Sequence, residues 1–127
     1  MSTWSAPVRY AEVDQQGIVF NAHYLLWCDE ALAAWCAELN LQRFAESVRL
    51  VTSTLTWSGP ARWGDVVEVD AACTRVGTTS VGLRFDVRAG GRPCCRVETT
   101  YVYADAAGEK QPIPPDLRER LLSPPAY

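Results

Sequence analysis

Three residues whose side chains or backbone could take part in acyl transfer lie close together near the start of the chain: Asp14, Gly17 and Asn21. A carboxylate such as Asp14 can attack an acyl carbon, or it can take a proton from an attacking water. An apolar segment typical of a helix follows directly. The free N–H groups at a helix start can hold the oxyanion formed at an attacked carbonyl. This order of residues therefore suits chemistry on an acyl group.

The same residues also permit a purely structural interpretation. Asp14 could cap the turn or the helix start, and the Asn21 side chain could cap the helix as readily as it could orient substrate or water. Gly17 is expected to adopt a positive φ, which would let a ligand approach the backbone. The elements around this segment must decide between the two interpretations.

Hydrophobic periodicity predicts those elements. Residues 6–13 alternate and predict a first strand, and residues 14–21 form a loop. Residues 22–39 predict a helix that carries few charges on any side, so we expect it to be buried on several sides by a sheet that curves around it. Four tryptophans are expected to pack in the core: Trp27, Trp35, Trp57 and Trp63.

The second half of the chain reads as a series of strands. Segments 47–58, 67–74, 81–88 and 94–103 are predicted strands, separated by glycine-containing turns. The chain turns again at Gly108 and ends in a proline-rich turn followed by a short helix. Residues 1–127 are therefore predicted to form a single α+β domain, with a long central helix wrapped by a curved antiparallel sheet of about five strands.

Composition excludes several classes of function. The net charge of -3 and the lack of a basic cluster argue against nucleic acid as a partner. No apolar run approaches the ~20 residues of a membrane span, and the N-terminus lacks the features of a signal peptide. Five cysteines without a CxxC pair and a single histidine, His23, predict no metal site. Reduced thiols in a cytoplasmic protein are the simplest interpretation.

Three motifs in order resemble the hotdog-fold acyl-CoA thioesterases, and specifically the 4-hydroxybenzoyl-CoA thioesterase-like family. The first motif consists of Tyr10, Asp14, Gly17, Val19, Asn21 and Tyr24. The second is GPARWGDVVEV at residues 59–69, and the looser third is GEKQPIPPDLRERL at residues 108–121. The resemblance spans nearly the whole chain.

The resemblance implies a thioesterase that hydrolyses an acyl thioester to a free acid and a thiol without a metal or other cofactor. It implies that Asp14 is the nucleophile or the general base, that the backbone amide at Asn21 holds the oxyanion, and that Gly17 shapes the catalytic loop. Residues expected to contact substrate are Ile18, Phe20, His23 and Tyr24, although Tyr24 could instead pack the first helical turn. The resemblance also implies a homodimer or homotetramer with sites at subunit interfaces.

Some relatives carry a basic cluster between the two central strands for the phosphates of coenzyme A, but here that turn reads RVGTTS and offers only Arg75. The acyl group could therefore arrive on coenzyme A or on an acyl carrier protein. One alternative is a hotdog module that binds an acyl thioester without cleaving it, although Asp14 argues against it. A hotdog dehydratase is another alternative, but it would need a catalytic histidine at a position where His23 does not lie.

Overall fold

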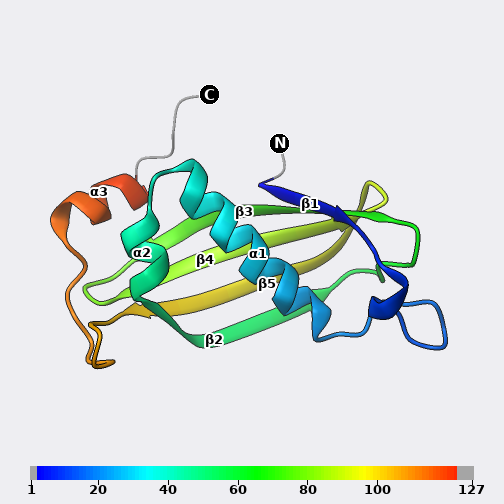
Figure 1. Ribbon diagram of the computed structural model, residues 1–127, viewed down its shortest axis with the longest axis horizontal. Coiled ribbons are helices and arrows are strands. Elements are labelled where there is room, and N and C mark those ends of the chain that lie inside the picture. The colour runs from blue at the N-terminus through cyan, green and yellow to red at the C-terminus, as the bar shows by residue number, and fades with distance from the viewer. Residues whose placement is uncertain (1–2, 123–127) are drawn as a thin grey trace.

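The protein is described by a computed structural model in which residues 3–122 are placed. Five strands form one antiparallel sheet with the order β1-β3-β4-β5-β2 (Figure 1). The strands are β1 (Trp4–Pro7), β2 (Val48–Trp57), β3 (Val66–Val76), β4 (Ser80–Ala89) and β5 (Arg92–Tyr103). The helices are η1 (Tyr10–Glu12, a 3-10 turn), α1 (His23–Glu38), α2 (Gln42–Ser47) and α3 (Pro115–Leu122). The predicted α+β layout of one long helix and about five strands is confirmed.

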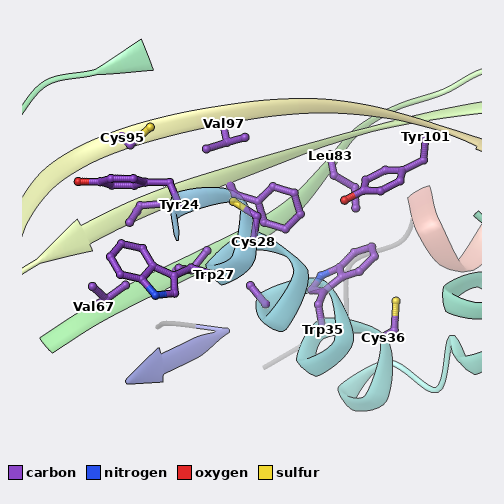
Figure 2. Close-up of a cluster of buried hydrophobic side chains, with 14 of the residues drawn as sticks. Tyr24, Trp27, Cys28, Trp35, Cys36, Val67, Leu83, Cys95, Val97 and Tyr101 are labelled. Atoms are coloured by element: carbon purple, nitrogen blue, oxygen red, sulfur yellow. The ribbon is translucent and has the colours of Figure 1, made fainter. Parts of the chain in front are cut away.

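The core lies between α1 and one face of the sheet. Alternating residues of β4 point at the helix, and Val81, Leu83, Phe85 and Val87 are all buried. Figure 2 shows aromatic and sulfur-containing side chains of α1 extending towards the apolar face of the strands. The period of two in the sequence therefore identified the buried face of this strand correctly.

The predicted strand at residues 6–13 is wrong beyond Pro7. Strand β1 ends at Pro7, and the chain then turns through η1. A carboxylate oxygen of Glu12 accepts a hydrogen bond from the backbone N–H of Arg9 at 2.7 Å. This local side-chain bond closes the turn, and it offers the backbone an alternative to a strand ladder that a period-two pattern does not reveal.

Two expectations about burial need correction. Trp27 and Trp35 are buried, but Trp57 is 43% exposed and Trp63 is 61% exposed. Helix α1 is not buried on several sides either, because a single sheet covers only one of its faces, and Leu26 remains 56% exposed. Apolar surface on the uncovered parts of α1 and β2 is thus left open in a single chain.

The remaining helices lie at the end of the sheet far from η1 (Figure 1). The short helix α2, which the sequence did not predict, joins α1 to β2. The predicted terminal helix is confirmed as α3, and its Arg118 donates to the carbonyl oxygen of Gly77 at 2.6 Å. Among residues 3–122, none of the helices has the length and hydropathy of a membrane span.

Candidate active site

The loop that carries Asp14 folds as a tight hairpin between η1 and α1. Val13 pairs with Val19, and the Asp14 N–H donates to the carbonyl oxygen of Ile18 at 2.9 Å. The Gly17 N–H donates to the carbonyl oxygen of Asp14 at 3.0 Å, and Gly17 has a φ of 74°. The left-handed conformation explains why a glycine stands at this position, as the sequence predicted.

The two carboxylate oxygens of Asp14 have different surroundings. Oδ1 accepts hydrogen bonds from the backbone N–H groups of Gln16 at 2.8 Å and Ile18 at 3.3 Å. Oδ2 has no hydrogen-bond partner within residues 3–122, and the side chain is exposed. One oxygen therefore fixes the orientation of the carboxylate, while the other stays free for chemistry.

Unpaired backbone donors lie where the loop enters α1. The His23 N–H donates to the carbonyl oxygen of Phe20 at 3.0 Å, and the Tyr24 N–H to that of Asn21 at 3.3 Å. The N–H groups of Asn21 and Ala22 make no hydrogen bond within the described residues. Ala22 occupies the N-cap, so a helix-capping role of the Asn21 side chain is not seen. This helix start can accept an anionic oxygen.

A segment distant in the sequence, residues 61–62, makes backbone contacts with the hairpin. The Val19 N–H donates to the carbonyl oxygen of Ala61 at 2.9 Å, and Ile18 pairs with Arg62. The Ala61 N–H in turn donates to the hydroxyl of Tyr24 at 3.0 Å. The first and second sequence motifs therefore meet in space, although Tyr24 and Ala61 are 37 positions apart in the chain.

The predicted substrate-contacting residues differ widely in exposure. Phe20 is 60% exposed, whereas Tyr24 is only 1% exposed and its hydroxyl is already engaged. Burial raises the pKa of Tyr24 above its ordinary value, so its hydroxyl stays protonated. Ile18 and His23 are half-buried, and the His23 ring meets the Phe20 ring edge-on with centroids 6.3 Å apart. Only Phe20 of these side chains is broadly open to a ligand.

Glu12 is a functional candidate that the sequence did not reveal, because it lies in segment 6–13, which was predicted to be a strand. Its Oε2 accepts a hydrogen bond from the Trp27 indole at 3.1 Å, and its Oε1 accepts one from the Arg9 backbone. Burial by itself raises the pKa of the Glu12 carboxyl, but these hydrogen bonds and the Arg9 charge outweigh that effect. The pKa lies below its ordinary value, and Glu12 is ionised at neutral pH.

Among residues 3–122, two of the surface cavities have volumes of about 590 Å³ each, and Asp14 lines neither of these two. One lies at the α2 end of the molecule, beside Arg43 and Tyr103, far along the chain and the sheet from the hairpin. The other lies between β1 and α1, beside Glu12 and Trp27. The Asp14 side chain is exposed, so within one chain it lies at the molecular surface.

Exposed aromatic side chains flank that open surface. Tyr10 is 72% exposed, and its ring meets the ring of Trp63 edge-on with centroids 5.2 Å apart. Trp63 contacts the hairpin directly, because its backbone N–H donates to the carbonyl oxygen of Gly17 at 3.4 Å. These two rings form an exposed apolar surface next to the hairpin, of the kind at which ligands or partner chains bind.

Comparison with known proteins supports an assignment to a family. A sequence model of the Thioesterase superfamily matches residues 16–96, which is more than half of the chain. A 1,4-dihydroxy-2-naphthoyl-CoA hydrolase from Synechococcus elongatus is 21% identical over 122 residues, which cover 90% of each chain.

Solved structures share the fold. A thioesterase from Thermus thermophilus, crystallised with coenzyme A and zinc, superposes with a TM-score of 0.85 at 22% identity and covers 93% of this chain and 89% of its own. A 1,4-dihydroxy-2-naphthoyl-CoA thioesterase from Synechocystis gives a TM-score of 0.79 at 21% identity, with 93% of each chain covered. The arrangement of strands and helix described above is therefore the hotdog fold of such enzymes.

Proposed function

The chain belongs to the thioesterase superfamily, and from this we propose that it hydrolyses an acyl-CoA thioester with Asp14 as the catalytic carboxylate. One observation carries the choice of residue. Asp14 is held by one oxygen while the other is unpaired and exposed, and its loop leads directly to the unpaired N–H groups of Asn21 and Ala22. A carboxylate that served only the turn would not need this arrangement.

Two chemical routes fit this geometry. In one, Asp14 takes a proton from a water whose oxygen bonds to the acyl carbon. In the other, an Asp14 oxygen bonds to the acyl carbon and forms an anhydride, which water then opens. In both routes the carbon–sulfur bond breaks, the sulfur leaves as a thiolate that takes up a proton, and the acid is released.

The oxyanion formed on the way is proposed to accept hydrogen bonds from the Asn21 backbone N–H, with that of Ala22 beside it. Such preorganised donors stabilise developing negative charge, and the loss of one typically costs about 10²–10³ in rate. Gly17 keeps the loop in its turn, and the Asn21 side chain is free to orient substrate or water.

Coenzyme A is the proposed carrier of the acyl group. The named relatives act on coenzyme A thioesters or were crystallised with coenzyme A. Ile18, Phe20 and His23 are proposed to contact the acyl group, with Tyr24 beneath them. The exposed rings around the hairpin make an aromatic acyl group the first choice, and an acyl carrier protein remains the alternative carrier.

A second copy of the chain is proposed to complete the site. Strand β2 lies at one edge of the sheet, and its Leu50 and Trp57 are 52% and 43% exposed on the face that points towards α1. Unpaired strand edges and open apolar faces are surfaces on which chains associate. The exposure of Asp14 in a single chain is consistent with such a dimer or larger assembly.

The cytoplasm is the proposed compartment, because all five cysteines are free thiols and four of them are buried. A binding module that does not cleave its thioester is the alternative function. The free oxygen of Asp14 argues against it, since binding alone requires no reactive carboxylate.

The test is thiol release from a panel of aromatic and aliphatic acyl-CoAs by the wild-type protein and by Asp14→Asn. We expect turnover of at least one aromatic substrate and a loss of about 10²–10⁴ or more in the variant. Equal turnover by both proteins would remove Asp14 from the mechanism. Binding without turnover, also with acyl carrier protein thioesters, would favour the binding module.

A further inference from the structure

We propose that Glu12 is a positioning residue that holds the Asp14 hairpin in register with the start of α1, an inference that rests on the proposed function. Among residues 3–122, Glu12 is the single charged side chain that is buried, at 6% exposed. A buried carboxylate is costly unless its oxygens are satisfied, so a role other than solubility must account for it.

Glu12 contacts both sides of the hairpin. Its backbone carbonyl oxygen accepts a hydrogen bond from the Phe20 N–H at 3.0 Å, directly after the hairpin. Its side chain accepts from the Arg9 N–H before the hairpin and from the Trp27 indole on α1. One residue therefore joins the two ends of the loop that carries Asp14 to the helix whose N-terminus faces the substrate.

A closed series of contacts continues from Trp27. The Trp27 ring meets the Tyr24 ring edge-on with centroids 5.0 Å apart, and Figure 2 shows both side chains leaving α1 on the same side. The Tyr24 hydroxyl accepts from the Ala61 N–H, and the Ala61 carbonyl accepts from the Val19 N–H, which returns the series to the hairpin.

The consequence concerns catalytic geometry. The Asp14 side chain is exposed and fixed only by bonds within its own turn. The position of that turn therefore depends on this series, together with the pairing of Ile18 with Arg62 and the bond from the Trp63 backbone N–H to Gly17. A misplacement of about 1 Å between a catalytic group and its substrate can cost about 10²-fold in rate. Removal of the Glu12 charge should therefore lower kcat more than it raises KM.

The experiment compares Glu12→Gln, Trp27→Phe and the double variant with a control, Leu117→Ala. Trp27→Phe keeps a ring but removes the indole donor, and it provides a milder variant if Glu12→Gln does not fold. Leu117 is buried in α3, far from the hairpin, so its truncation destabilises the fold without touching the site. The kcat and KM values are measured on the best acyl-CoA of the wild type, well below each melting temperature.

We expect Glu12→Gln to lower kcat by about 10–100-fold with KM nearly unchanged, and Trp27→Phe by less. The kcat of the double variant should be no lower than that of Glu12→Gln, because both substitutions disrupt the same contact between Glu12 and Trp27. Leu117→Ala should keep the wild-type kcat. A Glu12→Gln variant with wild-type kcat, or a control that loses kcat equally at an equal melting temperature, would overturn the proposal.

Amide hydrogen exchange separates this proposal from the proposed function. If the wild type hydrolyses no thioester, the exchange rates of the Val19 and Phe20 amides still report on the bracing of the hairpin. Faster exchange in Glu12→Gln but not in Leu117→Ala would support the role of Glu12 as a brace, even though the chemistry would need revision. Unchanged exchange would overturn it.

Discussion

Asp14 and Asp105 build the same turn in two different parts of the structure. In each turn Oδ1 accepts hydrogen bonds from the backbone N–H groups two and four residues later, at 2.8 and 3.3 Å for Asp14 and at 3.0 Å twice for Asp105. In each, a glycine three residues after the aspartate has a positive φ. The other oxygen differs, because Oδ2 of Asp105 accepts from the Gln111 side chain at 3.1 Å whereas that of Asp14 is unpaired within the described residues.

This pair provides a matched test of the catalytic role of Asp14. Asparagine keeps the oxygen that accepts the turn hydrogen bonds, so Asp14→Asn and Asp105→Asn should both leave the melting temperature almost unchanged. Only Asp14→Asn should lower kcat for thioester hydrolysis, by about 10²–10⁴-fold. Equal kcat values for the two variants would show that Asp14 serves only its turn.

The two turn glycines allow a second comparison. Gly17 has a φ of 74° and Gly108 a φ of 86°, and a Cβ at either position would meet no atom within 4 Å. Alanine at either position should therefore destabilise the fold through backbone strain alone, by about 1–2 kcal/mol. Gly17→Ala should in addition lower kcat, whereas Gly108→Ala should not, as urea unfolding and thiol-release assays on both variants would reveal. A loss of kcat in both variants would show that the lower stability, and not the position of Gly17, causes the loss.

Loss of the Tyr24 hydroxyl should be costly for stability. Tyr24→Phe leaves the buried Ala61 N–H without its acceptor, and an unsatisfied buried donor costs about 1–3 kcal/mol. Tyr101→Phe is the control, because Tyr101 is also buried but its hydroxyl has no hydrogen bond within residues 3–122. Urea unfolding of both variants should show a larger loss for Tyr24→Phe, and equal losses would contradict the assigned contact.

Stability should decline at alkaline pH because of buried thiols. Burial raises the pKa of Cys28 to about 12 from 9.0, and those of Cys36 and Cys95 to about 11. The unfolded chain releases these protons above pH 9 while the folded chain retains them, so the stabilising effect is complete below pH 9 and is lost as pH rises towards 11–12. At pH 10 each such thiol lowers the free energy of unfolding by about 1.4 kcal/mol relative to its value well below pH 9.

Urea midpoints at pH 8 and pH 10 measure this decline. The fall between the two values should be smaller in Cys28→Ala than in the wild type. Cys73→Ala is the control, because Cys73 is half-buried and its removal should reduce the fall less. An equal fall in Cys28→Ala and the wild type would mean that other groups cause the alkaline loss.

The proposed second copy predicts a difference between two exposed leucines. Leu50 lies on the edge strand β2 and Leu26 on α1, and they are 52% and 56% exposed. Leu50→Glu should place a charge in the proposed interface and shift the protein towards monomer, with a loss of activity, whereas Leu26→Glu should leave the oligomeric state unchanged. Analytical ultracentrifugation gives the mass, and a wild-type monomer would refute the interface.

The sequence by itself determined most of the elements, though not α2 or the end of β1, and the local turn chemistry. Alternation in residues 81–88 fixed which side chains of β4 face the core, because successive side chains in a strand point to opposite faces. Gly17 predicted a turn with a positive φ in the loop at residues 14–21, because a left-handed glycine and an aspartate oxygen can satisfy a turn locally. These features depend on neighbours in the chain, which a sequence pattern reports directly.

Only the tertiary structure decided how these parts meet. It placed Ala61 in contact with the hairpin and buried Glu12 against Trp27. It also left Trp57 and Trp63 exposed. Their hydrophobicity had led to the prediction that both tryptophans lie in the core. That prediction failed because the type of a residue does not state whether another segment covers it. Contacts between residues 15 to 42 positions apart follow from the way in which helix and sheet pack, and no local period in the sequence encodes them.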